Sequence, residues 1–151
     1  ARGATVHHDG LTFTWPDTAS GAPDNVIATG QTIALDGSGS RLGFLAAGSS
    51  SSLSGTGTVH YTNGTTGAFP LEVENYWQAP VDGNETVAVT PYCNSKGTEG
   101  RPRGQRQQQL YVLYTKAPIE AGKKVAAVTL PAGSFGSGRI TAMHVFATAI
   151  G

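Results

Sequence analysis

Several features that would point to particular classes of protein are scarce or missing in this sequence. It contains a single cysteine, Cys93, so neither an intrachain disulfide nor a thiolate metal site can form. Only 13% of the 151 residues are charged and the formal net charge is zero, which argues against nucleic acid and acidic membranes as partners. No apolar run approaches the ~20 residues that cross a bilayer.

Motifs for enzymatic chemistry are missing as well. The glycines form no G-x-S-x-G elbow, phosphate-binding loop or dinucleotide fingerprint. Glu72 and Glu74 are predicted to share one exposed face of a strand, so they do not form the opposed carboxylate pair of a glycosidase. The four histidines lack the i, i+4 helical spacing of a zinc-peptidase motif: His7, His8, His60 and His144. We therefore expect no catalytic residue in this chain.

The residues that are abundant predict an all-β fold. Glycine occurs 21 times, serine and threonine are common, and apolar residues alternate with polar ones with a period of two. This alternation predicts strands at residues 11–15, 26–35, 41–46, 57–62, 67–74, 86–92, 109–115, 124–130 and 139–149. About nine strands with turn signals between them indicate an antiparallel β-sandwich of jelly-roll type. We expect one domain over residues 10–151 and a tail or linker over residues 1–9.

Aromatic residues stand beside hydrogen-bonding side chains where several predicted strands end. A sugar presents one apolar C–H face and a ring of hydroxyls, so its site needs an aromatic surface next to amide or carboxylate groups. The sequence supplies this combination three times: Trp15 with Asp17, the stretch Asn75-Tyr76-Trp77-Gln78, and Tyr92 with Asn94. Each aromatic residue could also simply close the end of the sandwich.

Strand alternation suggests how these residues are grouped. Loops between successive antiparallel strands alternate between the two ends of a sandwich, which places 16–25, 47–56, 75–85 and 116–123 at one end. The predicted sugar site at that end has Trp77 as the stacking ring and Tyr76 as a second wall, with hydroxyl partners Gln78, Asn75 and Asp17. The opposite end receives the basic segment 94–108 and an alternative site for an anionic sugar, formed by Tyr92, Asn94, Arg101 and Arg103.

Longer segments resemble a known kind of domain. These are FTWPDTASGAPDNVIATGQTIAL, GSRLGFLAAG, VHYTNGTT, TPYCN, LYVLYTKAPIEAGKKVAAVTLP and HVFATAIG. In this order, over residues 10–151, they resemble an accessory β-sandwich domain of large secreted glycoside hydrolases of actinobacteria. The resemblance implies a galactose-binding-like fold, an extracellular location and a non-catalytic role. One departure is Cys93, which stands where the resemblance leads us to expect an arginine.

The resemblance also bears on the loop that follows Trp15. It implies that the Trp-Pro-Asp sequence is a structural entry to the sandwich, which makes Trp15 a core residue. Asp17, Asp24 and Asn25 would then either fix the loop through bonds to its backbone or bind a structural calcium ion. We expect no other cofactor.

Two functions from different classes remain open on the sequence alone. The first is a carbohydrate-binding module, whose partner is an oligosaccharide or polysaccharide and which keeps an enzyme near its glycan. The second is a structural domain that packs on the catalytic domain of the parent enzyme and binds no sugar. In both cases we expect a monomeric domain that binds neither nucleic acid nor membrane.

Overall fold

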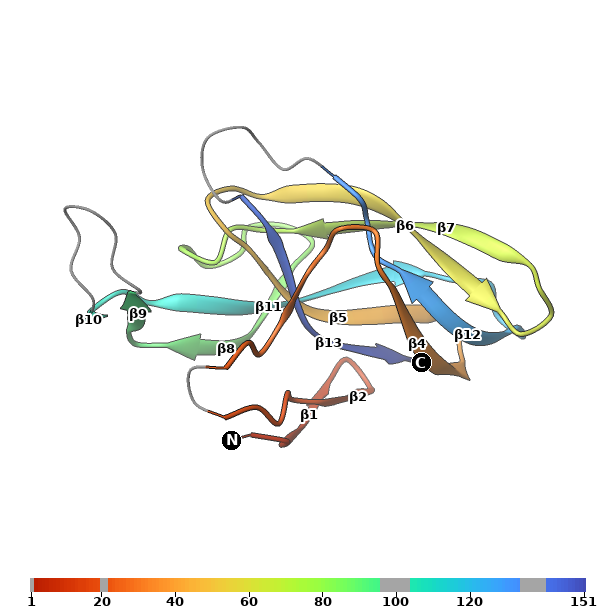
Figure 1. The fold of residues 1–151 in the computed structure, drawn as a ribbon, viewed down its shortest axis with the longest axis horizontal. Helices are drawn as coiled ribbons and strands as arrows, with labels where there is room; N and C mark the ends of the chain where they lie inside the picture. The colour runs from red at the N-terminus through yellow and green to blue at the C-terminus, as the bar shows by residue number, and fades with distance from the viewer. Residues whose placement is uncertain (1, 20–21, 96–103, 134–140) are drawn as a thin grey trace.

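The computed structural model describes residues 2–19, 22–95, 104–133 and 141–151, and these residues form an antiparallel β-sandwich (Figure 1). The predicted all-β sandwich is therefore confirmed. The jelly-roll topology is the finer part of that prediction and stays a prediction. Within the described ranges, no helix is long and apolar enough to cross a membrane.

Two sheets face each other, and two short hairpins lie outside them. The five-stranded sheet has the order β3 (Val26–Ile27), β13 (Met143–Ile150), β5 (Arg41–Gly48), β11 (Leu110–Pro118) and β8 (Glu85–Thr90). The four-stranded sheet has the order β4 (Thr32–Ser38), β12 (Lys124–Thr129), β6 (Leu53–Tyr61) and β7 (Thr66–Val73). The hairpins are β1 (Thr5–His8) with β2 (Leu11–Thr14), and β9 (Cys93–Ser95) with β10 (Gly104–Arg106).

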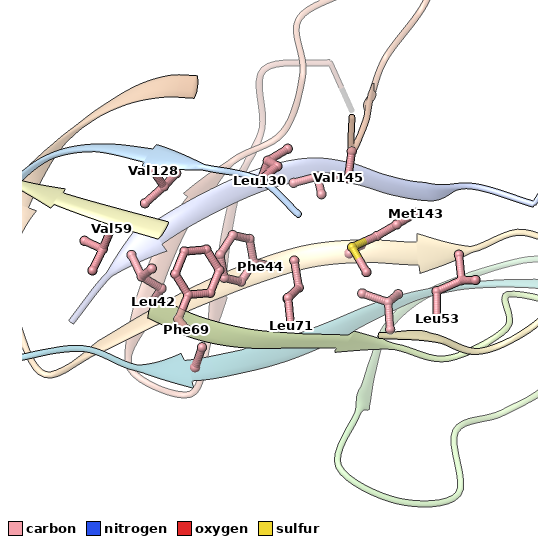
Figure 2. Packing of buried hydrophobic residues seen from close by; sticks show 14 of the residues in the cluster. Leu42, Phe44, Leu53, Val59, Phe69, Leu71, Val128, Leu130, Met143 and Val145 are labelled. Atoms are coloured by element: carbon pink, nitrogen blue, oxygen red, sulfur yellow. The ribbon is translucent and has the colours of Figure 1, made fainter. Parts of the chain in front are cut away.

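The main core lies between the two sheets and follows from the alternation of the strands. Phe44 of β5 stacks on Phe69 of β7, with ring centroids 5.6 Å apart, and both rings are fully buried. Figure 2 shows these rings among the aliphatic side chains of both sheets, including Leu42, Leu71 and Met143. Every second residue of an antiparallel strand points to the same face, so about half of the side chains of each strand point into this core.

The β1–β2 hairpin forms a third layer over the outer face of the five-stranded sheet, below it in the view of Figure 1. Leu11 and Phe13 are buried there against Leu45, Tyr114 and Ala149. Residues 5–8 are therefore part of the folded domain, whereas the sequence analysis placed them in a tail. The β1 sequence, Thr-Val-His-His, contains a single aliphatic residue and therefore shows no alternation to detect.

A polar cluster fixes the turn of this hairpin to the sheet. The Asp9 carboxylate accepts hydrogen bonds from the Tyr114 hydroxyl at 2.8 Å and from Lys116 Nζ at 2.9 Å, and Arg41 donates to the Asp9 carbonyl. The bonds from Lys116 and Tyr114 hold the pKa of the Asp9 carboxyl below its usual range. Burial, followed by the Asp9 bond, raises the pKa of the Tyr114 phenol.

The prediction of one strand over residues 26–35 is wrong. The chain leaves the five-stranded sheet after Ile27 and joins the four-stranded sheet at Thr32. Gly30 makes this crossing possible, because it has a positive φ of 83° and lies so close to Ala132 that a Cβ would come within 2.9 Å of the alanine methyl.

The direction of β8 differs from the one that strand alternation predicts. β5 ends at Gly48, and we call this end of the sandwich the Gly48 end. β7 also ends there, since its last residue, Val73, pairs with Leu53 at the start of β6. β8 then runs toward the same end, since its last residue, Thr90, pairs with Leu110. The connection between β7 and β8 thus folds back before β8 begins.

This reversal changes where the later loops lie. The described parts of segment 93–108 lie at the Gly48 end with residues 75–85, so the prediction that they occupy opposite ends is wrong. Segment 116–123 lies at the other end, because Pro118 pairs with Arg41 at the start of β5. The alternation rule assumes that each strand spans the sandwich, and β8 covers only part of it.

Replacing Asp9 with asparagine should destabilise the domain in a pH-dependent way. The folded-state pKa of this carboxyl lies below its unfolded value of ~3.9, so its contribution is complete above that value and is lost as the pH falls through the folded pKa. Urea unfolding of both proteins between neutral pH and about pH 3 should show a difference that shrinks below about pH 4.

A matched control is Asp36→Asn, since Asp36 forms an exposed ion pair with Lys124 at 2.8 Å. This variant should change the free energy of unfolding little at any pH, as exposed pairs do. A difference between wild type and Asp9→Asn that stays constant over the whole range would contradict the assignment.

Candidate functional site

The backbone of Tyr76 lies between two strands of the five-stranded sheet at the Gly48 end. The Tyr76 N–H donates to the carbonyl of Gly48, and the Tyr76 carbonyl accepts from the N–H of Tyr111, both at 2.9 Å. The neighbouring Asn75 forms a parallel bridge with Gly48. The pairing of β5 with β11 ends at Ala46 and Leu113, so the inserted segment replaces the next pairs of that ladder.

Two buried polar side chains hold the connection between β7 and β8 in place. Asn84 accepts a bond from the Glu74 N–H at 2.9 Å and donates to the Glu72 carbonyl at 3.2 Å. The Glu74 carboxylate accepts from the N–H groups of Val81 and Asp82 at 3.0 and 3.1 Å. The prediction that Glu74 shares an exposed face with Glu72 is wrong, because Glu74 follows the last residue of β7 and is buried.

This connection presents Trp77 at the surface. The indole is 41% exposed, and its ring lies 4.9 Å from the ring of Tyr76 at an interplanar angle of 34°. Asn75 Oδ1 accepts the Trp77 N–H at 3.0 Å and so fixes the backbone beneath the ring. Burial raises the pKa of the Tyr76 phenol, with a further contribution from Cys93, so the hydroxyl stays protonated at neutral pH.

Further apolar and aromatic side chains lie at the same end. Val89 is directly opposite Tyr111 in the pairing of β8 with β11, so the two side chains share a face, and Val89 is 44% exposed. Tyr92, which follows β8, is 41% exposed. The Tyr111 hydroxyl donates to the Gln109 amide at 3.3 Å. We call the set Tyr76, Trp77, Val89, Tyr92 and Tyr111 the aromatic end.

The structure unites part of the site predicted from the sequence. Tyr76, Trp77 and the exposed Gln78 lie together, whereas Asn75 has its side-chain oxygen bound to the Trp77 N–H. Asp17 binds Arg2 at 3.2 Å on the N-terminal hairpin, and no contact among the described residues joins it to Trp77. The prediction gave all five of these residues one common site.

The alternative site is covered only in part by the described residues. Tyr92 lies at the Gly48 end together with Trp77, and Asn94 belongs to β9. Arg101 and Arg103 lie outside the described residues. Tyr111 and Arg106 were not named as site residues from the sequence, although Arg106 belongs to the basic segment 94–108. Tyr111 lies within the regular alternation of a strand, and Arg106 pairs with Cys93 in a β-ladder too short to predict.

Trp15 and the acidic loop after it have structural contacts. The Trp15 indole is half-buried and stacks on Phe146, with centroids 5.3 Å apart and an angle of 11° between the rings. His144 Nδ1 lies 2.8 Å from Asn25 Oδ1, and the Asn25 amide donates to Asp24 at 2.9 Å. Burial lowers the pKa of His144, and the charge of Asp24 opposes this shift in part.

These contacts separate the residues that were considered as calcium ligands. Asp17 is bound to Arg2, while Asp24 and Asn25 belong to the group around His144. Within the described ranges, no three side chains of histidine, cysteine, aspartate or glutamate are placed to hold a metal ion. The described contacts of these three residues join side chains to side chains, so the bonds to the loop backbone that the other interpretation requires stay a prediction.

Comparison with known proteins adds no assignment. No model of a known family matches the chain, and no curated protein matches it. The resemblance to an accessory domain of glycoside hydrolases stays a prediction, and the function has to be argued from the site.

The anchoring of the aromatic end can be tested with Asn84→Ala. The substitution leaves the N–H of Glu74 buried without its acceptor, so the free energy of unfolding should fall by about 1–3 kcal/mol. Urea denaturation measures the change.

Asn63→Ala is the matched control for this variant. Asn63 Oδ1 also accepts a backbone N–H, that of Thr65 at 3.1 Å, but in an exposed turn where water can replace it. An equal loss of stability in the two variants would show that Asn84 is not a buried anchor.

Proposed function

We propose that this chain is a non-catalytic carbohydrate-binding domain and that the aromatic end is its site. The observation that carries the proposal is the exposed Trp77 ring, 4.9 Å from Tyr76, on a connection held by the buried Glu74 and Asn84. An aromatic ring fixed before binding loses little conformational entropy when a ligand stacks on it.

The polar groups around these rings suit the hydroxyls of a sugar. The protonated Tyr76 phenol can donate a hydrogen bond, and the exposed amide of Gln78 can both donate and accept. The Glu74 carboxylate is occupied by two backbone N–H groups, so it supports the connection and is not placed to act as an acid or base. These features favour binding over hydrolysis.

The role of such a site is to keep an attached enzyme near its glycan. The resemblance of the segments across residues 10–151 to accessory domains of glycoside hydrolases supports a secreted bacterial parent enzyme of this class. The domain would act in the extracellular space as a galactose-binding-like carbohydrate-binding module. The same resemblance supports a catalytic domain as its neighbour in the parent chain.

A second candidate is a structural domain that packs on the catalytic domain through the same end and binds no sugar. The observation that favours it is Val81, which is 77% exposed on the same connection as Trp77. Together with Val89 and Tyr92, it gives this end an apolar surface of the kind that mediates contacts between proteins. The two candidates predict different effects of substitutions at Trp77 and Val81 on binding to glycans and to the catalytic domain.

The test is binding by the isolated domain to a glycan array, followed by calorimetry on each glycan that binds. Trp77→Ala should lower the affinity by a factor of about ten to one hundred, because a stacked ring contributes roughly 1–3 kcal/mol. Trp77→Phe should retain most of the affinity, since it keeps a stacking surface.

Val81→Ala is the matched control on the same connection and should bind the glycan as the parent does. If no glycan on the array binds the domain, or if a folded Trp77→Ala variant binds as tightly as the parent, the proposal fails. Loss of binding to the catalytic domain in both variants would then favour the structural candidate.

A further inference from the structure

The reversed direction of β8 brings a basic side chain to the aromatic end. In the β9–β10 hairpin, Arg106 is directly opposite Cys93. Cys93 follows the last residue of β8, Thr90, by three positions, and Thr90 pairs with Leu110, next to the Tyr111 whose N–H binds the Tyr76 carbonyl. Neighbouring strands are about 4.8 Å apart, so the backbone of Arg106 lies one strand away from Cys93 at this end of the sandwich.

The charges around Arg106 leave its guanidinium accessible. Its side chain is exposed and forms no ion pair with any described residue. Two carboxylates of the β7–β8 region already have partners: Glu74 binds backbone N–H groups, and Glu85 lies 2.8 Å from His8 Nε2. The exposed Asp82 is the acidic residue that remains in the connection.

A guanidinium beside an aromatic surface has a defined chemical preference. Arginine presents a planar fork of N–H donors that matches a carboxylate and forms charge-assisted hydrogen bonds with it. A neutral sugar can stack on the aromatic rings and bond to the amides, but it offers no anionic partner to the Arg106 guanidinium. A uronic acid residue can interact with both the aromatic rings and the guanidinium, because its pyranose ring stacks and also carries a carboxylate.

We infer that the ligand of the aromatic end is a uronate-containing polysaccharide, with its pyranose ring on Trp77 and Tyr76 and its carboxylate at Arg106. The inference rests on the proposed carbohydrate-binding function and adds the class of the sugar. It also joins the two sites that the sequence analysis placed at opposite ends, one for a neutral and one for an anionic sugar.

The test compares carboxylated polymers with their neutral counterparts. Polygalacturonate, alginate and hyaluronan, each beside its carboxyl-reduced form, are titrated into the domain by calorimetry, with dextran sulfate as a sulfated polymer without uronate. At least one carboxylated polymer should bind tenfold or more tightly than its reduced form. Its affinity should fall as salt is added, since exposed charges are screened.

Two arginine variants locate the contact. Arg106→Gln should lose roughly tenfold or more of the affinity for the carboxylated polymer and none for its reduced form. Arg106→Lys should recover part of that loss, because it restores the charge without the fork. Arg2→Gln is the matched control: it makes the same change in net charge on the N-terminal hairpin, and it should bind as the parent does.

The other possible results contradict either the uronate inference alone or the carbohydrate-binding proposal as well. Equal binding of carboxylated and reduced polymers, or binding of neutral glycans alone, removes the uronate inference and leaves the carbohydrate-binding proposal standing. Binding of dextran sulfate alone, or equal losses in Arg106→Gln and Arg2→Gln, also removes it by showing general attraction to anions. If no glycan binds, neutral or acidic, both the uronate inference and the carbohydrate-binding proposal are wrong.

Discussion

The insertion of the Tyr76 backbone between β5 and β11 determines the layout of the Gly48 end. Its two hydrogen bonds, to Gly48 and from Tyr111, require the chain after β7 to approach the sheet as an extra strand segment. Gly48 permits this approach, because a Cβ there would lie 2.9 Å from the Glu74 carbonyl oxygen. The remaining residues of the connection must then return to begin β8 at Glu85, and this return places Trp77 at the surface.

The same insertion explains which parts of the fold could be predicted from the sequence. Alternation of apolar and polar residues identified the long strands, because residues such as Phe44 and Phe69 face one core. The Asn63-Gly64 sequence also indicates a turn, and Asn63 Oδ1 accepts the Thr65 N–H there, but only Gly64, with a φ of 84°, and not Asn63 has the positive φ of a primed turn. The short strands β1, β9 and β10 could not be predicted, because three or four residues with at most one apolar side chain show no period.

The direction of β8 could not be predicted for a different reason. Periodicity reports which face of a strand is buried and carries no information about where the strand starts along its neighbour. The bonds that set this start, from the Glu74 N–H to Asn84 and from the Val81 N–H to Glu74, join residues in a polar loop where no apolar pattern exists. For the candidate site, the sequence predicted that Tyr76 and Trp77 lie together, as their rings do at 4.9 Å, but it placed the basic segment at the wrong end.

One strand, β11, connects the aromatic end with the polar cluster around Asp9. Tyr111 at its beginning binds the backbone of Tyr76 in the aromatic end, while Tyr114 and Lys116 farther along bind Asp9 of the N-terminal hairpin. The hairpin covers the outer face of the sheet with Leu11 and Phe13, so β11 is packed on both faces between these two contacts. A strand held in this way is a rigid support, which is the property that a preformed stacking site needs.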